Sequence, residues 1–452
     1  MSGKLDMTQG IGWRHVVAFS MPMMLGNLLQ QLYNTVDGII VGQFVSEAAL
    51  GAVGNCASLT FVFIAIAFGL SIGSSTIVAQ CFGAGRQDDM RRAASTALIL
   101  LGAVGLAASV FGAVASPWLM STVLDISSKK VLHEATVYFT IYSCGLLFQF
   151  LYNAVSAILR AVGDSKATLY FLLVATIINL GLDLLFIVKF NWGVAGAAWA
   201  TIIAQFASTA FSLVYMFRRY PVFSFKLSEL KFHGDMAKTC LKLGIPAMLQ
   251  QSVVAVGSLF MQRLVNYFGD SLMAAFTVGN RVENYIFIPI MALNAGMSTF
   301  TGQNMGAGRP DRVRSCWKRI ELVSLCFSTV IAAAIYAFAA PISSLFGVEG
   351  DSLRMSVEMT RFMCFFFCIF SLYLPTSGLL QGAGDAFFTA LTSMSTLGVR
   401  VAVAYTMVFA FNVDYHAVWY AVPFGWVCCV ALAWGRYFSG AWEKKAVIKA
   451  KN

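Results

Sequence analysis

Apolar residues fill long stretches of this chain, and the polar residues are gathered between them. A membrane helix needs about 20 mostly apolar residues, and runs of that length recur from end to end. They predict twelve spans, at 15–43, 48–79, 93–117, 134–158, 167–188, 194–216, 240–267, 272–300, 315–340, 355–380, 388–411 and 415–438. The pattern therefore predicts an all-α integral membrane protein.

Composition supports this fold class, and the placement of charge adds a topology. The chain is 58% hydrophobic and 12% charged, whereas soluble domains are about 45–50% apolar and about 25% charged. The net charge of +10 suggests nucleic-acid binding only until the basic residues are located. They gather in alternate connections: Arg86, Arg91, Arg92; Arg160, Lys166; Arg218, Arg219, Lys226, Lys231, Lys238, Lys242; Arg309, Arg312, Arg314, Lys318, Arg319; and Lys444, Lys445, Lys449, Lys451. This positive-inside pattern predicts a multi-pass protein of the inner or plasma membrane, with both termini cytoplasmic and no nucleic-acid partner.

Three segments of the first half recur in the second half in the same order. "FSMPMMLGNLL" at 19–29 matches "LGIPAMLQQSV" at 243–253, "AQCFGAGRQDDMRRA" at 79–93 matches "GQNMGAGRPDRVRSC" at 302–316, and "SAILRAVGDSKATL" at 156–169 matches "SGLLQGAGDAFFTA" at 377–390. We predict a six-helix bundle at 1–216, a cytoplasmic basic linker at 217–239, a second six-helix bundle at 240–438 and a cytoplasmic tail at 439–452. Because six is even, the two bundles share one orientation, as in transporters with parallel repeats.

Two acidic residues of the first half have no counterpart in the second. In the register that pairs Pro22 with Pro246, Asp37 falls opposite Met261; in the third register, Asp183 falls opposite Ala404. The duplicated fold itself therefore does not require these acids. An ionisable side chain inside a span costs at least about 2.5–3.5 kcal/mol, and it is expected to face protein or a water-filled cavity.

Helical spacing predicts that the two acids share one site. Each lies roughly six residues, or about 9 Å at the helical rise, from the outer end of its span. Spacings of three and four place their polar neighbours on the same helix face: Gln30, Tyr33 and Asn34 with Asp37, and Asn179 with Asp183. Such a pair can share a cation or a proton. The alternative is that each acid is hydrogen-bonded separately to a neighbouring helix.

The second half has its own charged residues within the membrane. Glu283 and Arg400 both fall near the middle of their spans. They indicate either a neutralised ion pair that stabilises the second bundle, or a second site in which Glu283 binds a cationic substrate.

Helix-breaking residues also lie inside the spans. Prolines occur at 22, 246, 289, 375 and 423, and Gly38 follows Asp37 directly. We expect Pro22 and Gly38 to let the first helix bend, since such breaks mark bending sites in membrane helices.

An enzyme is not indicated. The four histidines, His15, His133, His233 and His416, lie at span ends or in loops, and no nucleophile or metal-ligand grouping accompanies them. Cys364 and Cys368 share a helix face but have no His or acid beside them, so we interpret them as core residues. We expect no structural metal and no cofactor.

The chain resembles the multidrug and toxic compound extrusion (MATE) transporters over nearly its whole length, in the bacterial branch that includes DinF-like and MepA-like proteins. The resemblance lies in "MPMMLGNLLQQLYNTVDGIIVGQF", the paired "GAGR" loops, "ILRAVGDSK", "VGNRVENYIFIPIMALNAGMSTFTGQNMGAGR" and "GLLQGAGD". It implies twelve helices in two pseudo-symmetric six-helix bundles around a central cavity. It also implies secondary active export of cationic or amphipathic small molecules in exchange for entering Na⁺ or H⁺.

The resemblance extends to individual residues. It implies a coupling site at Asp37, Asn179 and Asp183, with Thr201 and Asn153 as further polar members and Na⁺ as one of two possible ions. We expect a substrate cavity at Gln30, Tyr33, Asn34, Glu283 and Arg400. The chain has no acid deep in the spans at 240–267 and 355–380, where the NorM-like branch has important acids. The expected partners are organic cations or amphipathic drugs and the lipid bilayer, with the protein a monomer.

Two rival functions remain. A lipid-linked oligosaccharide or lipid flippase of the same wider superfamily would show a cationic cavity; Arg263, Arg281 and Arg400 favour it, whereas Asp37 and Asp183 oppose it. A channel is disfavoured because a duplicated bundle is typical of carriers. Sequence leaves both the substrate and the choice between Na⁺ and H⁺ open.

Overall fold

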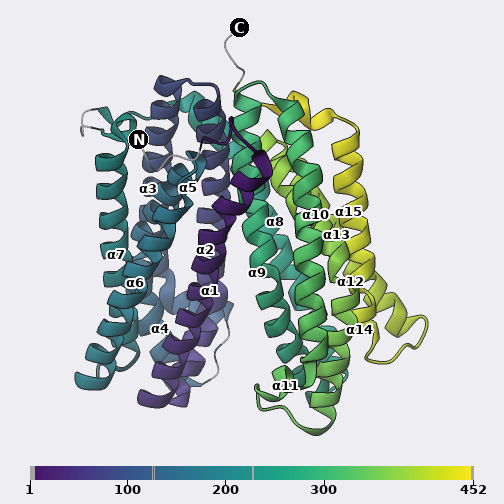
Figure 1. The fold of residues 1–452 in the computed structure, drawn as a ribbon. Helices are drawn as coiled ribbons and strands as arrows, with labels where there is room; N and C mark the ends of the chain where they lie inside the picture. Colours follow the sequence, from purple (N-terminus) through teal and green to yellow (C-terminus); the bar gives the residue numbers. More distant parts are fainter. Residues whose placement is uncertain (1–5, 125, 127, 226–228, 449–452) are drawn as a thin grey trace. The chain divides into compact units, whose positions relative to one another are not determined.

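The computed structural model is built from long helices joined by short connections (Figure 1). It describes residues 6–124, 126, 128–225 and 229–448. The expected membrane spans correspond to α1 (Gly12–Phe44), α2 (Glu47–Gly83), α3 (Gln87–Trp118), α4 (Lys129–Cys144) with α5 (Leu146–Ala161), α6 (Ser165–Asp183), α7 (Gly193–Arg219), α8 (Gly234–Tyr267), α9 (Asp270–Gly306), α10 (Pro310–Ala337), α12 (Gly350–Ala383), α13 (Ala386–Phe409) and α15 (Val422–Phe438). Short helices α11 (Ala339–Ser344) and α14 (Ala417–Tyr420) complete two of the spans. The all-α, twelve-span prediction is confirmed.

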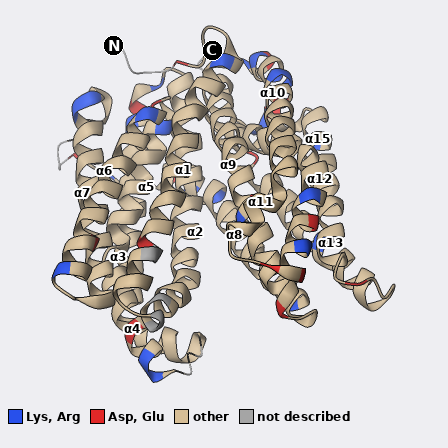
Figure 2. Ribbon diagram, turned by 60° about the horizontal axis from the view of Figure 1, so that its bottom comes forward, with Lys and Arg blue, Asp and Glu red and all other residues tan. Residues whose placement is uncertain are grey.

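Hydropathy accounts for most of these spans but not for two of them. Among the described residues, nine helices are long and apolar enough to cross a membrane, and the α4–α5 pair makes a tenth. The other two long helices are α1, with 33 residues, and α9, with 37. Both are diluted by polar residues, and α1 is the helix that contains Asp37. Figure 2 shows that many of the charged residues lie near the helix ends.

The chain forms two compact units that do not follow chain order strictly. Unit 1 contains Leu25–Ile245, and unit 2 contains Asp6–Met24 together with the chain from Pro246 onward. Helices α1 and α8 are therefore each divided between the units, close to Pro22 and at Pro246. Proline removes a helical hydrogen bond and weakens the helix locally, so each shared helix is weakened near the point where it passes from one unit to the other.

Both units pack their helices in the same way. In unit 1, α5 packs against α2, α3 and α7; in unit 2, α12 packs against α9, α10 and α15. The repeat relates each of these helices to its counterpart in the other unit. The turns match as well: Gly85 and Gly308 have φ of 68° and 69°, and Gly163 and Gly384 have φ of 88° and 95°. Residues with a Cβ rarely adopt such values, which explains the glycines of the repeated motifs.

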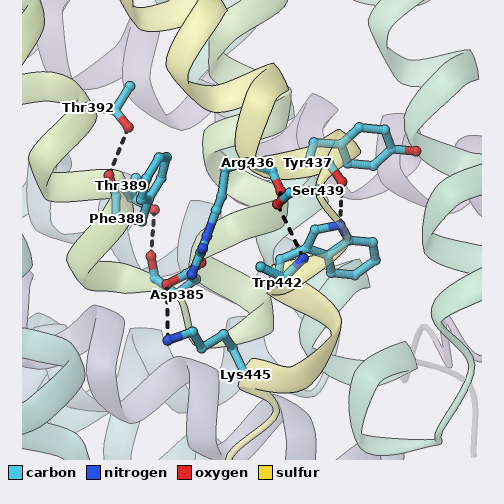
Figure 3. Close-up of polar contacts among 10 residues, drawn as sticks. Asp385, Phe388, Thr389, Thr392, Arg436, Tyr437, Ser439, Trp442 and Lys445 are labelled. Carbon is cyan, nitrogen blue, oxygen red and sulfur yellow. Dashed lines mark hydrogen bonds and ion pairs between the residues drawn. The ribbon is translucent and has the colours of Figure 1, made fainter.

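The repeated aspartates make equivalent contacts with different chemistry. Asp164 caps α6 by accepting from the Ala167 N–H (3.1 Å), and it accepts from the Tyr215 hydroxyl (2.9 Å). Its counterpart Asp385 precedes α13 and accepts from Arg436 Nε of α15 (2.7 Å), with Lys445 Nζ at 4.0 Å (Figure 3). Arg436 and Tyr215 occupy the same repeat position. Each aspartate thus ties the start of the fifth helix of its unit to the last.

The segments before α1 and α8 are also anchored alike. In unit 2, Arg312 donates to the carbonyl oxygens of Met7 (3.2 Å), Gln9 (3.0 Å) and Gly10 (3.1 Å). In unit 1, the Ser95 hydroxyl bonds both the N–H and the carbonyl of Lys231, each at 2.9 Å. Lys231 lies in the linker expected at 217–239, of which residues 226–228 are outside the described part, as are 449–452 of the tail.

The fourth span differs from its repeat counterpart. It was predicted as one helix at 134–158, but α4 and α5 meet at Gly145 with a 46° bend. A Cβ on Gly145 would lie 2.7 Å from Ile202 Cγ1 of α7, so close approach of α7 requires glycine at the bend. The related α12 is continuous through Pro375. Pro423 lies at the start of α15 rather than inside a helix.

Candidate functional site

Two carboxyl groups of unit 1 meet inside the bundle. Asp37 of α1 and Asp183, the last residue of α6, lie within hydrogen-bonding reach of each other. Two carboxyl groups form such a bond only when one of them carries a proton. The Oδ1 atom of each is buried without a hydrogen-bond partner among the described residues. Each acid therefore has one buried oxygen that lacks a donor, and a proton or a cation would satisfy it.

Neutral polar groups surround Asp183. With its amide nitrogen turned towards the acid, Asn179 donates to Asp183 Oδ2 (2.7 Å) and accepts from the Thr201 N–H (3.2 Å); this orientation satisfies both amide atoms. The Thr201 hydroxyl donates to the Ala197 carbonyl (3.0 Å), and Thr201 and Tyr33 line the same cavity. Among the described residues, no lysine or arginine pairs with either acid.

The chain geometry beside Asp183 is unusual. α6 ends at Asp183 and continues as a π-helical turn, Leu184–Lys189. Such turns are rare and often occur at functional sites. Asp183 is 1% exposed and Asn179 is 2% exposed, so both side chains are buried within the bundle.

A polar cavity adjoins the pair within unit 1. Its volume is about 110 Å³, and Tyr33, Asn179 and Thr201 belong to both the cavity wall and the site. The other lining residues are Gln30, Gln149, Tyr152, Leu172, Ala175, Thr176, Ala204, Gln205 and Ser208. The cavity has room for a few water molecules beside the acids.

The remaining predicted residues lie elsewhere. Asn153 donates to the Gln149 carbonyl of its own helix (2.8 Å) and is not part of the cavity wall. Asn34 is exposed on α1, and Gly38 lies in α1 with surroundings outside the described part. In unit 2, Arg400 interacts electrostatically with Glu283, but no direct ion pair joins them in the described structure, and Arg400 Nε lacks a partner.

Sequence reasoning missed a buried acid inside one of the spans. Glu321 of α10 is 6% exposed and accepts from the Thr376 hydroxyl at 2.6 Å. Its position at the end of the basic segment "RVRSCWKRIE" made it resemble a charge at the membrane surface. A signal existed, because Glu321 lies six residues inside the span at 315–340 and its repeat counterpart is Ala97 or Leu98.

One histidine forms a charged cluster in a loop of unit 2. His416 Nδ1 lies 2.5 Å from Asp414 Oδ1, and its Nε2 lies 2.7 Å from Glu358 Oε1. Partial burial would lower the pKa of His416, but the hydrogen bonds and charges of the two acids outweigh it and raise that pKa. Despite some desolvation, the bonds from His416 lower the pKa of Asp414.

Comparisons with known proteins agree with this architecture. A solved structure described as an outward-facing conformation of a multidrug resistance MATE family transporter has the same fold. Its TM-score is 0.91 at 23% identity, covering 98% of this chain and 99% of that one. Two proteins of Bacillus subtilis (strain 168) are similar in sequence. The probable multidrug resistance protein YoeA is 27% identical, covering 97% of this chain and 96% of YoeA. The probable multidrug resistance protein YpnP is 30% identical, covering 84% of each.

The family match also reflects the duplication. One family model, MatE, matches the chain twice, at residues 22–185 and 246–406. The two matches begin at Pro22 and Pro246, the pair that sets the first repeat register. The chain is a multi-pass membrane protein, and it belongs to the multidrug and toxic compound extrusion (MATE) family of transporters.

Proposed function

We propose that this protein is a secondary active multidrug efflux antiporter of the inner or plasma membrane, with both termini cytoplasmic. It exports cationic or amphipathic small molecules, and entering Na⁺ or H⁺ drives the export. The single observation that carries this proposal is the Asp37–Asp183 pair, which has two unpartnered buried oxygens and no basic neighbour in the described structure.

The surroundings of the pair suit either ion. A pair that shares one proton keeps one negative charge, which attracts a second proton or a cation. Na⁺ is a hard cation and takes oxygen ligands; the two carboxyl groups and the Thr201 hydroxyl supply them. A proton needs only the two carboxyl groups. Asn179 holds Asp183 in position in both cases.

Binding drives transport only if the ion favours one conformation. Neutralising Asp37 lowers the cost of placing the outer part of α1 in an apolar setting. That change would bias α1 towards a bent form and expel the substrate. The first part of α1 belongs to unit 2 and the rest to unit 1. A bend near Pro22 would therefore lie close to the point where α1 passes from unit 2 to unit 1.

The relatives named as multidrug resistance proteins favour drugs over lipid-linked sugars as substrates, and the flippase alternative is not favoured. Ethidium export from cells that express the protein tests this proposal. Asp37→Asn and Asp183→Asn should each abolish export while leaving the protein in the membrane. Asp270→Asn, at an exposed position in the first turn of α9, is the matched control and should export normally. Normal export by Asp37→Asn refutes the role of the pair.

A further inference from the structure

Glu321 of unit 2 is a buried acid with too few hydrogen-bond partners for a carboxylate. Its Oε1 is bonded to the Thr376 hydroxyl at 2.6 Å, and its Oε2 is buried without a partner among the described residues. The Trp317 indole N–H donates to the same Thr376 oxygen at 2.9 Å. An ionised carboxylate would normally accept several hydrogen bonds or pair with a cation when buried.

No cation compensates Glu321 within the described structure. The basic residues closest to it in sequence, Lys318 and Arg319, are exposed. Arg314, about two helical turns away on α10, forms an ion pair with Glu443 instead. α15 contributes Tyr437, whose ring stacks on Trp317 at 3.9 Å, and α12 contributes Thr376. α9 also packs against α10, but it brings no ionisable group to Glu321 in the described part. The acid therefore lies behind aromatic rings and has no counter-ion.

These contacts can be satisfied in both protonation states of Glu321, because the Leu372 carbonyl also accepts from the Trp434 indole N–H at 3.4 Å. In the first state Glu321 carries a proton. Its O–H then donates to Thr376 Oγ1, which also accepts from Trp317, and the Thr376 hydroxyl donates to the Leu372 carbonyl at 3.3 Å. When Glu321 is ionised, the Thr376 hydroxyl must donate to the carboxylate instead, and the Leu372 carbonyl loses that donor. Gaining or losing the proton thus reverses one hydrogen bond between α10 and α12.

That bond lies next to the proline of α12. Pro375 has no N–H, so the Ser371 carbonyl loses its usual helical partner. Ser324 of α10, one turn beyond Glu321, donates to this carbonyl at 2.8 Å. α10 thus supports the interrupted region of α12 at two points, and only the point at Glu321 can change with protonation.

We propose that Glu321 is a proton-binding site of unit 2, which takes up and releases one proton during the transport cycle and thereby switches the hydrogen bond between α10 and α12 beside Pro375. The proton comes from water and returns to water. The repeat position in unit 1 holds Ala97 or Leu98 and no acid, so unit 1 has no equivalent of this site. The role in a transport cycle rests on the proposed function, whereas the protonation of Glu321 does not.

Infrared difference spectroscopy tests the protonation on the full-length protein in lipid vesicles. The wild-type spectrum minus that of Glu321→Gln should show the C=O band of one carboxylic acid, with a shift in D₂O, and the band should diminish as the pH is raised. Because Asp37 and Asp183 are present in both proteins, they cancel. If Glu321→Gln does not assemble, Thr376→Val provides the second comparison. It keeps the acid but removes its partner, and it should shift the band.

Transport in the same vesicles tests the role of the proton. Ethidium export by the wild type should vary with pH, and Glu321→Gln, which resembles the protonated acid permanently, should lose part of that variation. Glu349→Gln, a change to an exposed acid just before α12 that makes no side-chain cap hydrogen bond, should keep the wild-type profile. An absent acid band, a band that does not change with pH, or a Glu321→Gln variant with the wild-type profile each overturns the proposal. A wild-type protein that does not export ethidium contradicts the proposed function instead, and the infrared result is read independently of it.

Discussion

Replacing Asn179 by alanine should weaken binding of the coupling ion without unfolding unit 1. The substitution removes the donor that lies 2.7 Å from Asp183 Oδ2. A hydrogen bond to a charged group contributes about 1.5–3 kcal/mol, and about 1.4 kcal/mol corresponds to a tenfold change in binding. We therefore expect the half-saturating concentration of the ion to rise roughly 10- to 150-fold.

A matched control exists in the same unit. Asn153→Ala makes the same chemical change, but in the described part of the chain Asn153 bonds the carbonyl of Gln149 on its own helix and does not contact either acid, so ion binding should remain near the wild-type value. The assay is thermal unfolding of purified protein at increasing Na⁺ and, separately, at decreasing pH, since a bound ligand stabilises the folded state in proportion to its occupancy. Equal behaviour of the two alanine variants would refute the assignment of Asn179 as the residue that holds Asp183.

Three further changes test the fold around the site. Asp385→Asn breaks the ion pair with Arg436, whose side chain is 23% exposed. Removing one partner of a buried pair costs about 3–5 kcal/mol. Because Arg436 is partly exposed, we expect thermal unfolding to show a smaller loss of stability, about 1.5–3 kcal/mol. His416→Gln should destabilise the protein most between pH 3.8 and 6.5, the ordinary pKa values of Asp and His. The stabilisation from charged His416 is lost as the pH rises through the raised pKa of His416. The stabilisation from ionised Asp414 is lost as the pH falls through the lowered pKa of Asp414. A difference in melting temperature between the variant and the wild type that stays the same at high pH would contradict this. Gly145→Ala should reduce the free energy of unfolding by about 1–3 kcal/mol, because its Cβ would meet Ile202. Gly54→Ala, with nothing within 4 Å of its Cβ, should leave that free energy nearly unchanged. Similar stability of the two variants would show that α4 and α5 can move apart.

Periodicity and hydropathy predicted the spans because helix formation in a membrane is decided locally, by the need to satisfy every backbone polar group. They also predicted that Asp37 and Asp183 would meet, since depth along a helix follows from residue count alone. The residues around that pair were harder to predict from the sequence. Thr201 was named only through the family resemblance, because the meeting of α6 with α7 depends on tertiary packing.

The same limit explains what was missed. The bend between α4 and α5 depends on the approach of Ile202 to Gly145, and no local pattern encodes that approach. The burial of Glu321 depends on Trp317 and Thr376, which lie on different helices. In the sequence the acid directly follows a basic segment at a span end, and the sequence analysis did not single it out. Its depth inside the span and the absence of an acid at its repeat position were the sequence signals that could have identified it.

Transport by vesicles that contain the purified protein tests the central claim most directly. A Na⁺ gradient and a pH gradient are imposed separately, and ethidium movement is followed for the wild type and for Asp37→Asn. We predict that at least one gradient drives movement in the wild type and that neither does so in the variant. Gradient-driven movement of wild-type extent in Asp37→Asn would contradict the claim that the Asp37–Asp183 pair couples ion entry to export.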